Sequence, residues 1–227
     1  MRSILRRLHR PVYESRVRAL SGRIARQLRP GDRVLDVGCG EGTLGAAVLR
    51  HPECPPGVRV EGLENRARGG EAIPVTAYSG SRFPFSDGSF DVVVIADVLH
   101  HEQRPDDLLG ECVRVARRAV VLKDHQISGF LARPRVMFLD WAANNPYGVQ
   151  CLFRYNTPAE WRATARRHRL RAVVEEGSMR DLYPPGLNTV FGGRIQYFAV
   201  LEKEETTLPG GSSGGNPMAR ERGRPDR

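Results

Sequence analysis

The sequence contains no long apolar run, and no uninterrupted one is longer than that from Val92 to Ala96. A helix that crosses a bilayer needs about 20 mostly apolar residues, so we expect no membrane span. The first ten residues, MRSILRRLHR, also lack the apolar core of a secretory signal, and an amphipathic helix is favoured there over a mitochondrial presequence. A cytoplasmic protein is therefore the expectation.

The four cysteines, at positions 39, 54, 112 and 151, include no Cys-x-x-Cys pair. Zinc ribbons and disulfide frameworks need cysteines at regular spacings. The pattern indicates neither of these, and it favours reduced thiols in an intracellular protein.

Lysine is nearly absent: Lys123 and Lys203 are the two lysines among 35 basic residues, so the formal net charge of +9 comes from arginine. Residues 1–33 hold ten arginines against Glu14 and Asp32. Such a segment can contact the phosphates of a nucleic acid. A solvated basic helix is the favoured interpretation.

Apolar residues recur every three to five positions between Val12 and Leu28, and Pro30-Gly31 follows. This spacing predicts a helix with one buried face. Downstream, short apolar segments alternate with helix-compatible ones, which is typical of an α/β fold with a mostly parallel sheet. The expected strands are residues 33–37, 58–63, 74–77, 90–96, 119–122, 171–175 and 195–201, and the expected helices are 43–50, 106–116 and 158–168.

The last of these helices has the clearest start signal. Thr157, Pro158 and Glu160 match a capping box with proline at the first helical position, an arrangement that satisfies free backbone N–H groups of the first turn.

A chain of 227 residues has room for one ordinary domain, which we expect to span residues 1–205. Residues 206–227 are rich in Gly, Ser, Pro and Arg, a composition that predicts a disordered tail. Residues 124–156 are too many for a plain connection and carry several aromatic side chains. This insert is either a helical excursion packed on the sheet edge or a lid beside a substrate pocket.

An apolar strand runs directly into glycines in the segment VLDVGCGEG, residues 34–42. Glycines permit a tight turn and leave backbone amides open to a ligand. A dinucleotide-binding motif would need a third glycine at the position of Thr43. Asp36, two residues before Gly38, suits a ligand with an ammonium group better than a pyrophosphate.

A carboxylate ends the next apolar segment, VEGLE, in which Glu64 lies 22 residues after Gly42. An acid at the tip of the second strand can accept hydrogen bonds from both hydroxyls of a ribose. Next to the glycine turn, Glu64 is predicted to be a ribose ligand rather than a solvated surface acid.

Three segments, VLDVGCGEG, VEGLE and FPFSDGSFDVVVIADVLHH, occur in this order and resemble class I S-adenosylmethionine-dependent methyltransferases of the ubiquinone/menaquinone-biosynthesis-like group (methyltransferase type 11). The resemblance covers about residues 12–201. It implies a Rossmann-like three-layer α/β/α sandwich whose mostly parallel seven-stranded sheet has an antiparallel last strand. It also implies S-adenosyl-L-methionine as the cofactor, bound by Asp36, Gly38, Cys39, Gly40, Glu64, Gly80, Ser81, Asp97 and Val98.

Within this resemblance, the turn Gly80-Ser81 would face the adenine edge. Family members commonly place an Asp shortly before the Leu-Pro-Phe-like segment, and the best-matching position here is Ser79. Adenine recognition is therefore expected to be altered rather than absent.

Methyl transfer from a sulfonium depends largely on holding two reactants in line, and a neutral histidine can accept the proton of a phenol or amine. His100, His101 and His125 follow strands at the ligand-binding edge. His125 and His101 are the candidate catalytic residues, although His100 and His101 could instead cap the turn after the fourth strand.

No two of these histidines have the i, i+4 spacing of zincin sites, and sulfonium chemistry needs no Lewis acid, so we expect no metal. The leading hypothesis is methyl transfer to a small-molecule acceptor, partly aromatic or apolar, with nucleic acid disfavoured as a partner. One alternative is an RNA methyltransferase that uses the Arg-rich N-terminal helix, and another is a noncatalytic cofactor-binding partner module. The acceptor, its reacting atom and the oligomeric state stay open.

Overall fold

The computed structural model describes residues 2–66, 69–79, 82–145, 148 and 150–204, with the backbone alone for residues 2–9. The predicted adenine-side turn Gly80-Ser81 and the predicted tail, residues 206–227, lie outside the described residues. Within the described part, no helix combines the length and the apolar character that a bilayer crossing requires.

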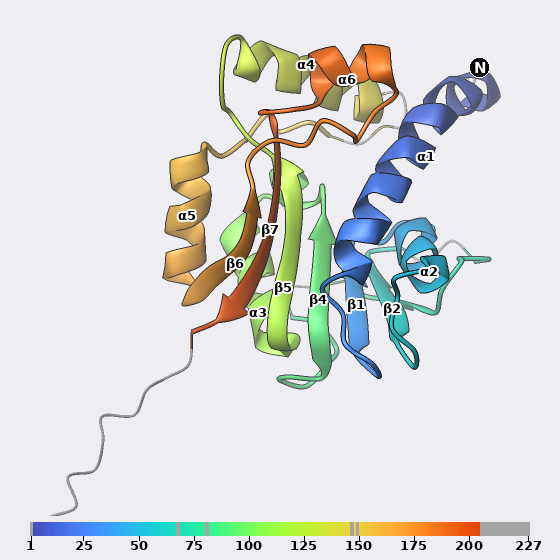
Figure 1. Ribbon diagram of the computed structural model, residues 1–227, viewed down its shortest axis with the longest axis vertical. Coiled ribbons are helices and arrows are strands. Elements are labelled where there is room, and N and C mark those ends of the chain that lie inside the picture. The colour runs from blue at the N-terminus through green and yellow to red at the C-terminus, as the bar shows by residue number, and fades with distance from the viewer. Residues whose placement is uncertain (1, 67–68, 80–81, 146–147, 149, 205–227) are drawn as a thin grey trace, which may run out of the picture.

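A seven-stranded sheet forms the centre of the molecule, with the order β3-β2-β1-β4-β5-β7-β6 (Figure 1). Strands β1 to β5 pair in parallel, whereas β7 pairs antiparallel with both β5 and β6. The strands are β1 (Arg33–Val37), β2 (Arg59–Glu64), β3 (Val75–Ala77), β4 (Phe90–Ala96), β5 (Ala116–His125), β6 (Leu170–Glu176) and β7 (Gln196–Lys203). This topology confirms the predicted fold, including the antiparallel last strand.

Helices cover both faces of the sheet. Helices α1 and α2 lie on one face and α3 and α5 on the other, while α4 and α6 lie beyond the end toward which the β4 arrow points (Figure 1). The helices are α1 (Arg2–Ala25), α2 (Thr43–Arg50), α3 (Pro105–Val115), α4 (Ala132–Asn144), α5 (Pro158–Arg167) and α6 (Pro185–Phe191), with a 3-10 turn η1 (Leu99–His101).

The apolar core is divided by the sheet because successive residues of a strand point to opposite faces. Val34 of β1 packs in one cluster with Leu20 of α1. Its neighbour Leu35 packs in the other cluster with Leu109 of α3 and Trp161 of α5. Burial on both faces explains why the central strands are almost continuously apolar.

Helix α1 differs from its predicted bounds of residues 12–28. It begins before the predicted start and continues through Pro11, and it ends at Ala25. Leu20 and Ile24 are buried as the spacing predicted.

Strand β5 is longer than the predicted strand of residues 119–122. Its ladder with β7 continues as far as the pair His125–Gln196, so Asp124 and His125 belong to the strand rather than to the connection after it. Helix α6 was not predicted from the sequence, and none of its residues is fully buried.

The predicted insert of residues 124–156 therefore begins within β5, and it contains α4. Tyr155 is buried, whereas Phe130, Phe138 and Trp141 are exposed. The ring of Phe138 stacks on that of Phe191 from α6 at 5.9 Å between centroids. The insert is partly helical and lies beyond the end of the sheet, but three of its aromatic side chains do not pack on the sheet edge as that interpretation expects. Its role as a lid stays a prediction.

The predicted capping box at the start of α5 is present. Thr157 Oγ1 accepts a hydrogen bond from Glu160 N–H at 3.3 Å, and the Glu160 carboxylate accepts one from Thr157 N–H at 2.7 Å. These bonds satisfy two backbone donors that a helix start leaves unpaired.

We predict that Thr157→Ala lowers the free energy of unfolding by about 1 kcal/mol, because the variant loses the oxygen that accepts from the first turn. Urea denaturation measures this loss. Thr157→Ser is the matched control, since it keeps the hydroxyl and should unfold close to the parent protein. An equal loss in both variants would show that the cap is not the cause.

Candidate functional site

The carboxyl ends of the parallel strands meet at one edge of the sheet (Figure 1), the edge at which open α/β folds bind ligands. Four of the predicted site residues lie there. Asp36 is on β1, Glu64 ends β2, Asp97 directly follows β4, and His125 ends β5. The sheet order places β1 between β2 and β4, and β5 beside β4, so these residues come from neighbouring strands.

The glycine turn after β1 contacts residues at the ends of the two neighbouring strands, β2 and β4. Gly38 has φ +69° and Gly40 has φ +57°, a left-handed conformation that favours glycine. A Cβ on Gly38 would lie 2.5 Å from Val98 Cγ2, so Val98 packs directly on the turn, whereas a Cβ on Gly40 would meet no atom within 4 Å. Gly40 N–H donates a hydrogen bond to Glu64 Oε2 at 2.9 Å.

Cys39 is part of this turn, but its side chain is directed toward the protein interior. A Cβ on Gly62 of β2 would lie 2.4 Å from Cys39 Sγ, and burial raises the pKa of the thiol to about 12. The thiol is therefore a packing group, and what Cys39 can offer to a ligand is its backbone. Ser79, the position in question for adenine, is exposed after β3.

Asp36 is buried, with 3% of its surface exposed. Burial raises its pKa to about 7, while the positive charge of Arg16 and the backbone N–H of Gly45 act in the opposite direction. Its Oδ2 atom has no hydrogen-bond partner. A buried carboxylate oxygen without a partner is costly unless a ligand satisfies it.

Asp97 is the most strongly engaged acid at this edge. It has φ +56°, accepts a bond from Lys123 Nζ of β5 at 2.5 Å, and forms an ion pair with Arg16 of α1. Burial raises the pKa of Asp97, but Arg16 and Lys123 hold it well below its usual range. The side chain is therefore an anion held between two cations.

Arg16 was not identified from the sequence, and the interpretation of the N-terminal segment as a solvated basic helix is wrong for this residue. Its side chain is only 22% exposed, and its buried Nε has no hydrogen-bond partner. Arg16 precedes the buried Leu20 and Ile24 by four and eight positions, which is the spacing of one helix face. That spacing was a signal for its inward direction.

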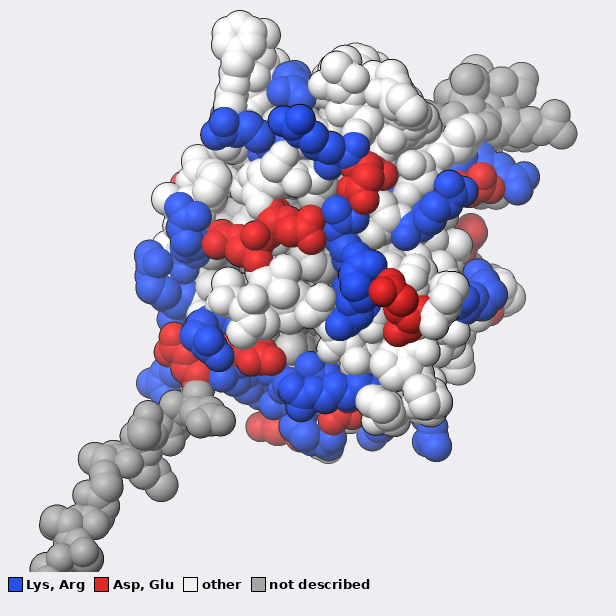
Figure 2. All heavy atoms as spheres, viewed as in Figure 1, with Lys and Arg blue, Asp and Glu red and all other residues white. Residues whose placement is uncertain are grey.

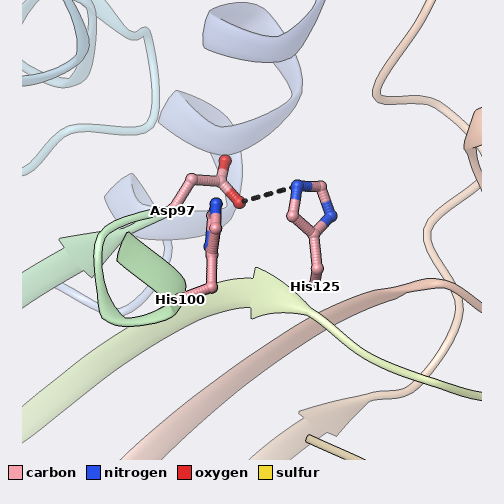
Figure 3. A group of neighbouring side chains, drawn as sticks. All are labelled: Asp97, His100 and His125. Atoms are coloured by element: carbon pink, nitrogen blue, oxygen red, sulfur yellow. Dashed lines mark ion pairs between the residues drawn. The ribbon is translucent and has the colours of Figure 1, made fainter. Parts of the chain in front are cut away.

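Two histidines lie beside Asp97, and a third packs against one of them. Figure 3 shows His100 from η1 and His125 from β5 next to the Asp97 carboxylate, and its dashed line marks the ion pair between His125 Nε2 and Asp97 Oδ1, which are 4.0 Å apart. His100 Nδ1 lies 2.5 Å from Asp124 Oδ1, and the rings of His100 and His101 are 4.0 Å apart between centroids.

The histidines differ in charge preference. Burial, with the neighbouring Lys123, lowers the pKa of His125 well below its ordinary value, and burial together with His100 lowers that of His101. For His100, burial favours the neutral form, but Asp124 outweighs it and raises the pKa. His125 is therefore neutral at pH 7, and its buried Nδ1 has no hydrogen-bond partner.

Helix α4 adds an acid that the sequence analysis missed. Asp140 is buried and accepts a hydrogen bond from Tyr155 O–H at 2.5 Å. Its Oδ1 lies 3.8 Å from His100 Nε2 and 3.9 Å from His101 Nε2. The contact joins the insert to η1, and no sequence pattern near Asp140 predicts it.

Comparison with known sequences shows that this chain is similar to methyltransferases. Residues 18–125 match the family model of the methionine biosynthesis protein MetW. An uncharacterized methyltransferase of Mycobacterium sp. (strain JLS) is 38% identical over 101 residues, covering 41% of this chain and 38% of the relative. The ubiquinone biosynthesis O-methyltransferase of Hahella chejuensis is 31% identical over 119 residues, covering 48% of each. The chain thus spans less than half the length of these curated relatives.

Among solved structures, an S-adenosylmethionine-dependent methyltransferase from Aquifex aeolicus superposes with a TM-score of 0.58 at 15% identity, covering 88% of this chain and 97% of that one. At this identity the likeness concerns the fold. The comparisons confirm the predicted resemblance to S-adenosylmethionine-dependent methyltransferases, and the described residues have their Rossmann-like fold.

We predict that Asp36→Asn changes how stability depends on pH. A carboxyl group with a folded-state pKa near 7 and an unfolded value near 4 stabilises the fold below the unfolded value, and this contribution is lost as pH rises through 7. The variant has no charge to bury. Relative to the parent, it should gain stability on the order of a few kcal/mol between pH 4 and 8.

Urea denaturation of both proteins at several pH values measures this difference. Other titrating groups affect the parent and the variant equally, so the difference isolates Asp36. A difference that does not change with pH would contradict the burial of this carboxylate.

Proposed function

We propose that this protein is a methyltransferase that moves a methyl group from S-adenosyl-L-methionine to a small-molecule acceptor. The observation that carries the proposal is a pair of buried polar atoms without partners beside the glycine turn, Asp36 Oδ2 and Arg16 Nε. An amino acid carries one ammonium and one carboxylate, and these two atoms are one acceptor and one donor. The similarity to methyltransferases supports the same reading.

The residues around the turn fit the cofactor. When bound, S-adenosylmethionine supplies an electrophilic methyl group on its sulfonium. Asp36 would accept from the ammonium group, and Arg16 would donate to the carboxylate. Glu64 would accept from the ribose hydroxyls beside or in exchange for its two present donors, Gly40 N–H and Asn65 N–H, each at 2.9 Å. Gly38, Cys39 and Val98 would complete the wall of the site.

The histidine cluster provides the acceptor side. A cavity of ≈ 110 Å³ is lined by His100, Asp124, His125, Tyr155 and Trp161, among others. His125 would be the base where an acceptor must lose a proton, because it is neutral and its Nδ1 is unpartnered. His101 is the second candidate. Most of the rate enhancement would come from holding the acceptor in line with the methyl group.

A small-molecule acceptor is favoured over RNA because several arginines of the N-terminal segment form ion pairs with acidic side chains of this chain. Figure 2 shows basic and acidic side chains interspersed over one face rather than a continuous basic surface. The name of the Hahella chejuensis relative, an O-methyltransferase of ubiquinone biosynthesis, also favours a small acceptor. The paired arginines are Arg10, Arg16, Arg23 and Arg26, with Glu14, Asp97, Glu176, Asp181 and Glu53 as their acidic partners.

We also infer that residues 1–205 form the methyltransferase domain, with residues 124–156 as its substrate-side lid. A cytoplasmic location is part of the same proposal, and the free thiols of Cys39, Cys54 and Cys112 support it.

We predict that Gly40→Ala lowers the affinity for S-adenosylmethionine by at least about tenfold. The new methyl group would occupy the space next to the turn in which the proposed ligand lies, and a tenfold change corresponds to about 1.4 kcal/mol. Isothermal titration calorimetry measures this loss.

Gly31→Ala is the matched control for this variant. Gly31 also has a positive φ, +79°, and a Cβ there would meet no atom within 4 Å, but it precedes β1, at the opposite end of that strand. Both variants carry a similar backbone strain, and only Gly40→Ala should lose the cofactor. Equal affinities would place the ligand elsewhere.

The overall function is tested by methyl transfer from radiolabelled S-adenosylmethionine to a panel of phenols, amines, quinone precursors and RNA. We expect labelled product from one class of small molecule, and binding of S-adenosylmethionine but not of NAD in calorimetry. Turnover of RNA alone would contradict the proposed acceptor, and cofactor binding without any turnover would favour a noncatalytic module.

A further inference from the structure

We propose that His100, His101 and Asp140 form a binding site for one divalent transition-metal ion. The proposed ligand atoms are the Nε2 atoms of the two histidines and Oδ1 of the aspartate, which all lie within 4.8 Å of one another. They come from η1 and from α4, two elements that only the folded chain brings together.

The distances between Asp140 and the two histidines suit ligands of a shared metal ion better than direct hydrogen bonds. Asp140 Oδ1 lies 3.8 Å from His100 Nε2 and 3.9 Å from His101 Nε2, which is too long for a hydrogen bond. Two ligands of a tetrahedral zinc ion, each about 2.1 Å from the metal, are roughly 3.4 Å apart. The two distances to Asp140 Oδ1 would therefore each need to shorten by about half an ångström to fit one coordination shell.

Each histidine is oriented by a contact of its Nδ1 atom, the ring nitrogen that does not face Asp140. His100 Nδ1 lies 2.5 Å from Asp124 Oδ1, and His101 Nδ1 lies 3.3 Å from the carbonyl oxygen of Gln150. Both partners only accept hydrogen bonds, so both Nδ1 atoms carry protons. In the neutral rings, the lone pairs are then on Nε2 and are directed toward Asp140.

Asp140 is held in the same manner. Tyr155 O–H donates to its Oδ2 at 2.5 Å, and the Asn144 amide donates to its Oδ1 at 2.8 Å. Oδ1 keeps a second lone pair, since a carboxylate oxygen accepts more than one bond. Metal-binding histidines and carboxylates are typically oriented by such outer hydrogen bonds.

With both rings neutral, the arrangement brings three acceptor atoms to one point, and a second proton on His100 is the alternative to a metal ion. Acceptors that face one another repel unless a cation lies between them, and this cluster is buried apart from the partly exposed His101. Asp124 and Asp140 supply negative charge for a divalent ion. Asp97 is a less suitable ligand, although it also lies near His100 and His125, because Lys123 and Arg16 already neutralise it.

Two imidazoles and one carboxylate suit zinc, cobalt or ferrous iron rather than magnesium or calcium. Three protein ligands leave a coordination position open, which is the pattern of metal sites that bind a further ligand. The expectation of no metal rested on the absence of an i, i+4 histidine pair and on a methyl transfer that needs no Lewis acid. In the folded chain, the third proposed ligand is a carboxylate from the distant helix α4, and the proposed ion has no assigned role in methyl transfer.

A Co²⁺ titration of the full chain, free of any affinity tag and in the absence of S-adenosylmethionine, tests this site. We expect one equivalent of Co²⁺ to bind with visible d–d absorption, and Zn²⁺ to displace it. His101→Gln should abolish the absorption or weaken Co²⁺ binding by more than tenfold. Because no methyl donor is used, the result is independent of the proposed methyl transfer.

Two further variants separate metal binding from a folding defect. Tyr155→Phe keeps the ring but loses the bond to Asp140, and it should weaken binding by about 10–100-fold. His168→Gln is the matched control, since His168 also faces a carboxylate, that of Asp106 at 3.4 Å, but outside the cluster. It should bind Co²⁺ like the parent.

Circular dichroism checks that each variant is folded. If the parent chain shows no d–d absorption at millimolar Co²⁺, or if folded His101→Gln binds as the parent does, the site is not a metal site. A proton on His100, shared with Asp124, would then be the charge that stabilises the cluster.

Discussion

The ion pairs of Asp97 with Arg16 and Lys123 connect the three elements that form the candidate site. Removing a carboxylate from water is costly, and partners repay the cost only when their geometry is good. Here the partners come from α1 and β5 and meet an acid at the end of β4. The helix is thereby fixed above the glycine turn, and the two halves of the site acquire defined positions on either side of Asp97.

These halves differ in their electrostatics. On the β1 side, burial raises the pKa of Asp36, and a cationic ligand would favour its ionised form. On the β5 side, burial lowers the pKa of His125, so that a neutral base adjoins the same edge. Environments that shift an acid and a base in opposite directions are typical of functional sites. One cationic cofactor and one neutral acceptor would suit this division.

The features that the sequence predicted are local ones. The glycine turn and the Thr157 cap depend on residues close together in the chain, and the apolar strands depend on burial of both sheet faces. The missed features depend on tertiary contacts. Arg16 lies on the buried face of α1, but its partner Asp97 is distant in the sequence. Asp140 reaches the histidines because α4 folds over the end of the sheet. The end of β5 was also missed, since its pairing with β7 determines it.

A crystal structure of the complex with S-adenosylhomocysteine tests this arrangement. We expect the ligand's ammonium group on Asp36 Oδ2, its carboxylate on Arg16 Nε, and its ribose hydroxyls on Glu64. A ligand bound elsewhere, with Asp36 and Arg16 contacted only by protein atoms, would contradict it.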